Sequence, residues 1–230
     1  MVIIITGTRK GIGKELAEYF IADGHHVIGC SRGETSIERP NYEHHSLDIT
    51  NEIAIKTFYS QIRKKYGRLD VLINNAAVNN ALAPIALVSY NAAATTMNTN
   101  FMGSFLMSRE AIKLMMKNSF GRIVNMGSMA VKYEEKGEAI YTASKAAVLA
   151  MTKIMAKEVF QYGITCNAVS PSAIKTDLMD NIDPDALNVV LKRNAIPEMG
   201  TTKELIDTLK WLISPQADKI TAQNIYLGGV

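Results

Sequence analysis

Short runs rich in β-branched residues alternate with amphipathic helical patterns along nearly the whole chain. Such runs are typical of buried strands, and a helix between two of them is the usual connection in a parallel sheet. The alternation predicts an α/β fold: a single doubly wound domain over 1–230, with a mostly parallel seven-stranded sheet and helices on both faces. The expected strands are 2–6, 26–31, 44–49, 70–76, 121–127, 163–170 and 223–229, and the expected helices are 13–24, 54–67, 90–118, 139–159 and 202–214.

One connection departs from this alternation. The twelve residues between the second and third expected strands, RGETSIERPNYE (32–43), contain Pro40 and show no apolar periodicity. We therefore expect a short, non-helical connection in place of the usual crossover helix.

Composition and charge exclude several classes of protein. The net charge is +3 without any block of lysines and arginines, which argues against a nucleic-acid partner. No apolar run approaches the roughly 18 residues that a membrane span needs, and the opening MVIIITG lacks a signal-peptide pattern. We expect a soluble cytoplasmic protein in which Cys30 and Cys166 are buried free thiols. The histidines form two adjacent pairs, which a strand would point to opposite faces, so we expect no metal site.

The first expected strand leads into a glycine-rich segment, VIIITGTRKGIGKEL, at the start of the first expected helix. Gly7, Gly11 and Gly13 follow a G-x-x-x-G-x-G spacing. Glycines at a strand-to-helix turn let the backbone approach a pyrophosphate, whose charge then lies at the helix N-terminus. The segment predicts a dinucleotide-phosphate site, and a tight turn without a ligand is the alternative.

The residues after the second expected strand bear on which dinucleotide binds. An acidic residue there suits the free 2′-hydroxyl of the adenosine ribose, whereas an arginine suits a 2′-phosphate. The chain has Ser31 and Arg32 at this point and no acid, and Lys10 adds a cation within the glycine turn. The pattern favours NADP(H), and two solvated surface cations are the alternative.

Tyr141 and Lys145 lie four residues apart near the start of the helix expected over 139–159. This spacing puts a phenol and an ammonium on one helix face, one turn apart. A cation at that distance favours the phenolate and lowers the pKa of tyrosine, ordinarily near about 10. The pair suits proton transfer, and a buried tyrosine beside a snorkelling lysine is the alternative.

Several segments together resemble the short-chain dehydrogenase/reductase family, in particular its 3-oxoacyl-carrier-protein reductase-like members. The resemblance covers essentially the whole chain and implies a Rossmann fold. It also implies an NADP(H)-dependent oxidoreductase that interconverts a carbonyl and a secondary alcohol by hydride transfer. The matching segments are the glycine turn at 6–13, NNAA at 74–77, Asn100 in the long helix, Ser128 after GRIVNMG, YTASK at 141–145 and NAVSPSAIKT at 167–176.

The resemblance implies a catalytic group of four residues. Tyr141 would donate a proton to the carbonyl oxygen during reduction, or accept one during oxidation, and Ser128 would hydrogen-bond the same oxygen. Lys145 would also bond the nicotinamide ribose. Asn100 would hold a water that relays protons between Lys145 and solvent.

Cofactor contacts and a substrate lid are implied in the same way. Asp48 would meet the adenine amino group, and Asn74 and Ala76 would line the cofactor after the fourth strand. Thr176 would meet the nicotinamide amide, and 177–200 would form the lid. The full implied cofactor-binding set is Gly7, Lys10, Gly11, Ile12, Gly13, Arg32, Asp48, Asn74, Ala76, Tyr141, Lys145 and Thr176.

Three positions depart from the family pattern. Ala77, Ser172 and Ala222 each stand where glycine is usual. The first two adjoin the expected cofactor site, where a side chain in place of glycine can change the local backbone.

The resemblance also bears on partners. The helices 90–118 and 139–159 carry apolar and methionine side chains on more than one face. In the family these helices pair with those of a neighbour, so we expect a homo-oligomer, either a dimer or a tetramer, that acts on a small-molecule carbonyl or alcohol.

Two positions bear on whether the substrate is attached to an acyl carrier protein. Two arginines that dock an acyl carrier in 3-oxoacyl-carrier-protein reductases are replaced by Ser119 and Tyr162, with Lys117 and Arg122 nearby as partial compensation. We therefore favour a substrate outside the main fatty-acid cycle. A reductase of fatty-acid synthesis and a non-catalytic dinucleotide-sensing protein of the same fold are the alternatives.

Overall fold

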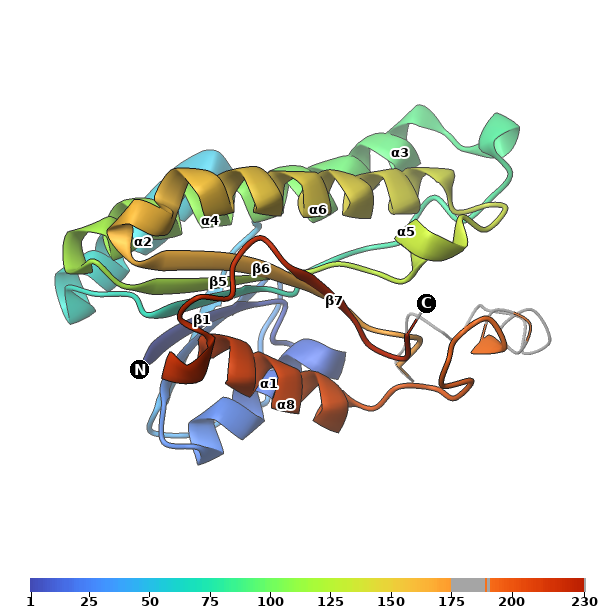
Figure 1. Cartoon of the computed structure of the whole chain (residues 1–230). Coiled ribbons are helices and arrows are strands. Elements are labelled where there is room, and N and C mark those ends of the chain that lie inside the picture. The colour runs from blue at the N-terminus through green and yellow to red at the C-terminus, as the bar shows by residue number, and fades with distance from the viewer. Residues whose placement is uncertain (175–188, 190, 230) are drawn as a thin grey trace.

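A computed structural model describes residues 1–174, 189 and 191–229, which are layered around one seven-stranded sheet (Figure 1). Every strand pairing is parallel, and the strand order is β3-β2-β1-β4-β5-β6-β7. The expected sheet is thus confirmed, and all of it is parallel. The strands are β1 (Val2–Thr6), β2 (His26–Ser31), β3 (Tyr42–Ser46), β4 (Val71–Asn74), β5 (Gly121–Met126), β6 (Ile164–Ser170) and β7 (Asn224–Tyr226).

The strand order reverses between β1 and β4. From β1 the chain moves outward to β2 and β3, then returns to the centre and continues from β4 to β7 in the other direction. At such a switch point the connections leave the sheet toward opposite faces, which opens a crevice beyond the carboxyl ends of the strands.

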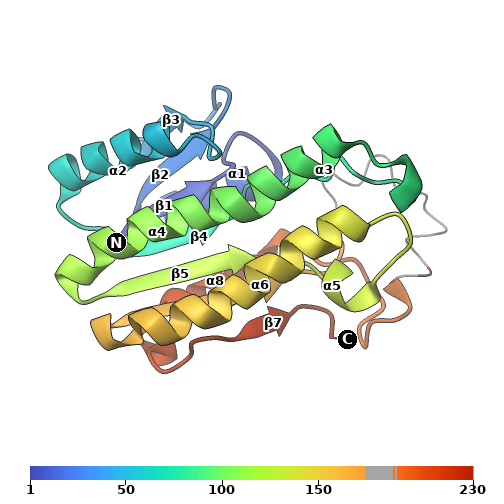
Figure 2. The ribbon, with the colours of Figure 1, turned by 90° about the horizontal axis from the view of Figure 1, so that it is seen from above.

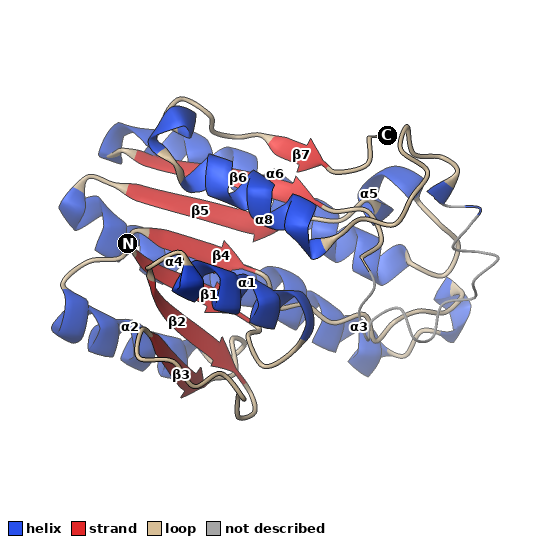
Figure 3. Cartoon of the chain, turned by 90° about the horizontal axis from the view of Figure 1, so that it is seen from below, coloured by secondary structure: helices blue, strands red, loops and turns tan. Residues whose placement is uncertain are grey.

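Helices cover both faces of the sheet. Seen from above, α2, α4 and α6 lie across one face (Figure 2), and from below α1 and α8 cover the other (Figure 3). Two short helices, α3 and α5, lie toward the carboxyl ends of the strands (Figure 2). The helices are α1 (Gly11–Ala22), α2 (Glu52–Tyr66), α3 (Tyr90–Met97), α4 (Ser104–Met115), α5 (Ala130–Tyr133), α6 (Ala139–Val159) and α8 (Thr202–Ile213).

The sheet is buried on both sides, as its apolar strands predict. Along β1, Ile4 packs into the core beneath α2, α4 and α6, whereas Ile3 and Ile5 pack toward α1 and α8. A strand covered on both faces needs no polar alternation, which explains the run VIIIT. Cys30 and Cys166 are buried free thiols, as expected, and burial raises the pKa of each to about 12.

The connection between β2 and β3 contains no helix over residues 32–41, as expected. The helix expected to run unbroken over 90–118 differs. The chain is helical throughout this range, but it widens into a π-helical turn at Asn98–Gly103, between α3 and α4, which the sequence pattern did not predict. Close packing accompanies this turn, because a Cβ on Gly103 would lie 2.7 Å from Ile49 Cδ1. Such turns are frequent at functional sites, and this one contains Asn100.

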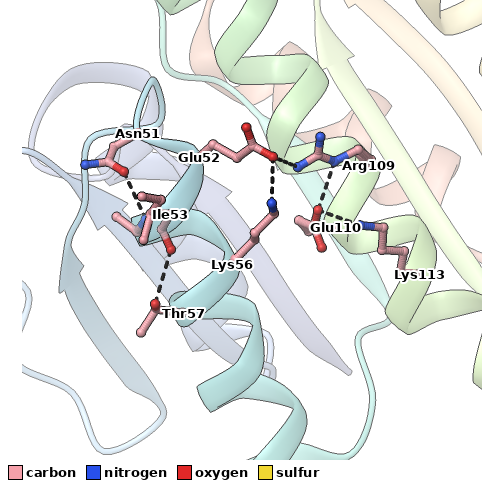
Figure 4. Close-up of polar contacts among 9 residues, drawn as sticks. Asn51, Glu52, Ile53, Lys56, Thr57, Arg109, Glu110 and Lys113 are labelled. Atoms are coloured by element: carbon pink, nitrogen blue, oxygen red, sulfur yellow. Dashed lines mark hydrogen bonds and ion pairs between the residues drawn. The ribbon is translucent and has the colours of Figure 1, made fainter.

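Polar contacts fix α2 at its start and along its side (Figure 4). The Asn51 side chain accepts a 3.0 Å hydrogen bond from a backbone N–H of the first turn and so caps the helix. Glu52 pairs with Lys56 at 2.8 Å and with Arg109 of α4 at 2.9 Å. Hydrogen bonds from these two cations hold the pKa of Glu52 at about 2. Exposed pairs of this kind add little stability, but they connect α2 to α4.

Among the described residues, no helix has the length and apolar character to cross a membrane. In the same part of the chain, no three His, Cys, Asp or Glu side chains are gathered as metal ligands would be.

Ala222 carries backbone strain that glycine would relieve. Its φ of 61° lies in the left-handed region, which costs an L-residue about 1–2 kcal/mol. Part of the gain from Ala222→Gly is offset by the greater freedom of glycine in the unfolded chain. We expect the substitution to raise the free energy of unfolding by roughly 0.5–1 kcal/mol in urea titrations.

Ala150 provides the control for this prediction. It is exposed within α6, where the same exchange to glycine should lower the free energy of unfolding by about 1 kcal/mol. A loss of stability at both positions would show that the backbone at Ala222 is unstrained.

Candidate active site

A cleft of about 910 Å³ opens at the carboxyl ends of the strands, over the switch point. Its wall includes the turn after β1, the segments after β2, β3 and β4, and the first turn of α6. Chain segments that are far apart in the sequence therefore meet around one space.

The glycine turn forms the floor of the cleft. Gly7 has a φ of 79°, which disfavours any side chain. A Cβ on Gly13 would lie 2.2 Å from the carbonyl oxygen of Gly7 and 2.5 Å from Asn75 Nδ2. Gly11 and Ile12 also line the cleft at the start of α1. The turn thus exposes backbone at a helix N-terminus, the arrangement that suits a phosphate.

Three cations stand at one end of the cleft. Lys10 and Arg32, both expected there, line it and are exposed. Arg9 lines it as well, and its side chain lies against Gly33, where a Cβ would be 3.2 Å from Arg9 Cδ. The sequence reasoning missed Arg9, although its position beside Lys10 in the glycine turn was a signal.

Of the other expected cofactor residues, some line the cleft and some lie outside the described residues. Asp48 and Ala76 line the cleft, and Asp48 Oδ1 accepts hydrogen bonds from the backbone and hydroxyl of Thr50 at 2.9 and 2.8 Å. Thr176 lies outside the described residues, as does most of the expected lid over 177–200.

Asn74, also expected at the cofactor, is not among the residues that line the cleft. Its side chain points into the interior, where Nδ2 donates to Asn125 Oδ1 at 2.7 Å and to Ser108 Oγ at 2.9 Å. Asn75 takes its place in the cleft wall. The reason is strand alternation: Asn74 is the last residue of β4 and faces α4, and the next residue leaves the sheet toward the cleft.

Tyr141, Lys145 and Ser128 come together as expected. Tyr141 and Lys145 line the cleft, and Lys145 Nζ is 5.9 Å from the centroid of the Tyr141 ring. Lys145 is 4% exposed and donates a 2.8 Å hydrogen bond to the Met126 carbonyl. Ser128 lies beside the Tyr141 phenol and acts to lower its pKa.

The electrostatics differ from the expectation of a depressed tyrosine pKa. Burial raises the pKa of Tyr141 above its ordinary value, and Glu138 adds to this, although the neighbouring Ser128 hydroxyl opposes it. Burial also lowers the pKa of Lys145 to about 8. Desolvation therefore outweighs the cation, since Lys145 directs its ammonium to a carbonyl rather than to the phenol oxygen.

Asn100 reaches the site through its neighbours. Its Oδ1 accepts from Val78 N at 2.8 Å, and its Nδ2 donates to Val78 O at 2.9 Å and to Ser144 Oγ at 3.0 Å. Ser144 in turn donates to the Tyr141 carbonyl at 2.6 Å. Both amide hydrogens of Asn100 are used, so a water relay would need one of its remaining oxygen lone pairs.

The departures from the family pattern lie where expected. Ala77 lines the cleft. Ser172 is buried behind it and accepts a 3.1 Å hydrogen bond from Asn194 Nδ2. Asn194 also accepts a hydrogen bond from the Tyr133 hydroxyl. Ser172 thus connects the segment after β6 to α5, a link that glycine could not make.

The strand order, the helices on both faces and the cleft at the switch point define a Rossmann-like α/β protein. The family model for short chain dehydrogenases matches residues 1–187. The chain belongs to the short-chain dehydrogenase family.

Curated relatives agree with this assignment. The 3-oxoacyl-[acyl-carrier-protein] reductase FabG of Vibrio cholerae is 31% identical, and the match covers 99% of this chain and 96% of that protein. FabG of Rickettsia felis is 32% identical, with 98% and 94% covered.

Solved structures show the same fold. Ligand-free aldohexose dehydrogenase from Thermoplasma acidophilum has a TM-score of 0.89 at 29% identity, covering 99% of this chain and 92% of that one. ElxO with NADP bound also has a TM-score of 0.89, at 30% identity, with 98% and 96% covered. A Tyr-to-Phe variant of ElxO with NADPH bound matches equally well.

Proposed function

We propose that this protein is an NADP(H)-dependent oxidoreductase that interconverts a carbonyl and a secondary alcohol, with Tyr141 as proton donor and acceptor. One observation carries the proposal: the Tyr141 phenol and the buried Lys145 line the same cleft as the glycine turn and the three cations. A dinucleotide needs both groups of residues, the cations for its phosphates and the phenol for proton transfer at the nicotinamide.

The residues present fit such a cofactor. The glycine turn leaves room for a pyrophosphate against the start of α1. Asn79 in the cleft wall has a buried side-chain oxygen without a hydrogen-bond partner among the described residues. An unpaired buried acceptor is costly, so this oxygen suits a donor group on a ligand. Arg9, Lys10 and Arg32 would hold a 2′-phosphate.

The chain's own residues supply the proton chemistry. The bound nicotinamide supplies or accepts the hydride. The raised pKa of Tyr141 keeps its phenol protonated at neutral pH, which suits a proton donor to a carbonyl oxygen. Ser128 would donate a hydrogen bond to the same oxygen as charge develops. Lys145 would bind the nicotinamide ribose and favour the phenolate that remains after proton transfer.

A non-catalytic dinucleotide sensor is the main rival. A sensor needs the phosphate turn and the cations, but it has no use for a phenol and a buried lysine in the same cleft. Retaining Lys145 inside the protein has an energetic cost, since burial lowers its pKa to about 8. We therefore favour the enzyme.

Similarity to FabG makes a 3-oxoacyl-carrier-protein reductase the second candidate function. Arg122, considered from sequence as a compensating cation, is 3% exposed and paired with Asp218. It cannot dock an acidic carrier. Ser119 is exposed but uncharged. We therefore propose a substrate outside the main fatty-acid cycle, either a free small molecule or a group on a different acyl or sugar carrier. Turnover of a 3-oxoacyl group on acyl carrier protein, much faster than on a short thioester, would reverse this choice.

Replacing Arg32 tests the choice of cofactor. We expect the wild type to bind NADPH at least about 10-fold more tightly than NADH, since a charge-assisted hydrogen bond contributes roughly 1.5–3 kcal/mol when desolvated and less when exposed. Arg32→Ala should remove most of this preference, measured as dissociation constants by fluorescence titration.

Arg39 offers a matched control. It lies in the same connection and is exposed, but it is outside the cleft wall. Arg39→Ala removes the same net charge and should leave the NADPH preference unchanged. If the wild type binds NADH as tightly as NADPH, the cofactor part of the proposal is wrong.

A further inference from the structure

Two side chains of the edge strand β3 reach across the sheet toward the cation end of the cleft. Tyr42 and His44 are two residues apart and so point to the same face. Neither is in the cleft wall. His45 points the other way, and its ring packs on Phe58 of α2 at a centroid distance of 4.9 Å.

The two rings take part in a chain of hydrogen bonds. The Tyr42 hydroxyl oxygen lies 2.9 Å from Thr8 Oγ1 and 2.9 Å from His44 Nδ1. His44 Nε2 is 2.9 Å from the carbonyl oxygen of Gly33 and 3.1 Å from Ser31 Oγ. A carbonyl oxygen only accepts, so Nε2 carries a hydrogen that it donates to Gly33, and Nδ1 of the neutral ring accepts the hydrogen of the Tyr42 hydroxyl.

This series of hydrogen bonds passes over β2 at Gly29. A Cβ on Gly29 would lie 2.2 Å from the Tyr42 hydroxyl oxygen and 2.4 Å from Thr8 Oγ1. Distances below 3.0 Å do not occur for a real Cβ, so any larger residue at Gly29 would displace this contact. The glycine on β2 therefore makes the contact between β3 and the glycine turn possible.

At each end, this series of hydrogen bonds reaches a segment that carries cations of the cleft. Thr8, which is fully buried, immediately precedes Arg9 and Lys10 in the glycine turn. At the other end, Gly33 follows Arg32 directly, and the Arg9 side chain lies against Gly33. The hydrogen bonds therefore fix the two cation-bearing segments relative to one another.

We propose that His44, together with Tyr42, is a positioning residue for cofactor selection: it holds the Ser31–Gly33 turn against the glycine turn so that their cations converge on a 2′-phosphate. This rests on the proposed function, because it assumes that the cleft binds NADP(H). His44 acts through Arg32 and Arg9 and touches neither cofactor nor substrate. Its loss loosens recognition of the 2′-phosphate and leaves proton transfer at Tyr141 unaffected.

The test compares His44→Ala, His44→Gln and His45→Ala by steady-state kinetics with NADPH and with NADH. His44→Ala should raise KM for NADPH about 5- to 10-fold, the effect of one or two hydrogen bonds of ordinary net strength. It should change KM for NADH and kcat by less than about 2-fold, within the scatter expected of a remote contact. His44→Gln keeps a donor for Gly33 and should recover part of the NADPH affinity. Tyr42→Phe should give a smaller loss.

His45→Ala is the matched control, since it removes the adjacent imidazole on the opposite face of β3. It should leave the ratio of the two KM values at the wild-type level. Thermal unfolding of each variant shows which ones are folded, and His44→Gln serves if His44→Ala does not fold. Equal loss of affinity for both cofactors, or no recovery in His44→Gln, would overturn the proposal.

Arg32→Ala separates this inference from the proposed function. If wild type and Arg32→Ala both fail to discriminate between the cofactors, the NADP(H) part of the proposed function is wrong. If Arg32→Ala loses the preference and the His44 variants keep it, only the positioning role is wrong. In the double variant with His44→Ala, the loss should be smaller than the product of the two single effects, because both act on one contact.

Discussion

Replacing Tyr141 with phenylalanine is expected to reduce carbonyl reduction by at least about 10²-fold, the low end for loss of a general acid. The substitution keeps the ring, which lines the cleft, and removes only the phenolic proton. Because the cations and the glycine turn are unchanged, NADPH should bind within about 2-fold of wild-type affinity. Single-turnover kinetics and fluorescence titration give the two quantities.

Tyr90→Phe controls for the loss of a hydroxyl elsewhere. Tyr90 is 84% exposed and lies outside the cleft wall, so its variant should turn over like the wild type. Near-normal turnover by Tyr141→Phe would refute the proton-donor role.

Replacing Lys145 with methionine should abolish detectable turnover and weaken NADPH binding, but it should not lower stability. Lys145 is 4% exposed, and among the described residues its ammonium donates one hydrogen bond, to the Met126 carbonyl. Its pKa of about 8, lowered from 10.5 by burial, indicates that the charged form is disfavoured in the folded state. At about 1.4 kcal/mol per pKa unit, this amounts to a penalty on the order of 3 kcal/mol at neutral pH. Methionine has similar length without the charge.

The effect of Lys145 on stability should also depend on pH. Between the folded pKa of about 8 and the unfolded value near 10.5, the unfolded chain binds more protons at Lys145 than the folded one. The contribution of Lys145 to stability therefore rises with pH in this window and is lowest below it. We expect urea unfolding of the cofactor-free proteins to show the largest excess in free energy of unfolding of Lys145→Met over the wild type at about pH 7. This excess should shrink toward about pH 10. A variant less stable than the wild type at neutral pH would contradict the stated cost of burial.

The architecture could be predicted because it depends on patterns within single segments. The apolar run of β1 and the polar 32–43 stretch each identify an element or its absence without knowledge of neighbours. The π-helical turn at Asn98–Gly103 leaves no such pattern in the sequence, and the close packing of Gly103 on Ile49 that accompanies it is a contact between distant segments.

The same division applies to the site. Tyr141 and Lys145 were predictable as a pair from helical spacing alone. The pKa of Tyr141 was not, because it depends on the balance between burial and a cation whose hydrogen-bond partner the sequence does not reveal. Asn74 was misplaced because the end of a strand decides which of two adjacent asparagines faces the cleft. Arg9 was missed because the turn conformation alone brings its side chain against Gly33.

NADPH oxidation in the presence of a ketone panel tests the central claim most directly. The panel should include aliphatic, aromatic and polyhydroxy ketones and a short 3-oxoacyl thioester, each followed by loss of NADPH absorbance with wild type and Tyr141→Phe. The account predicts steady, ketone-dependent oxidation by the wild type with at least one compound, and a rate at least about 10²-fold lower for Tyr141→Phe. Tight NADPH binding by the wild type without oxidation of NADPH by any member of the panel would contradict it and favour a dinucleotide-sensing protein.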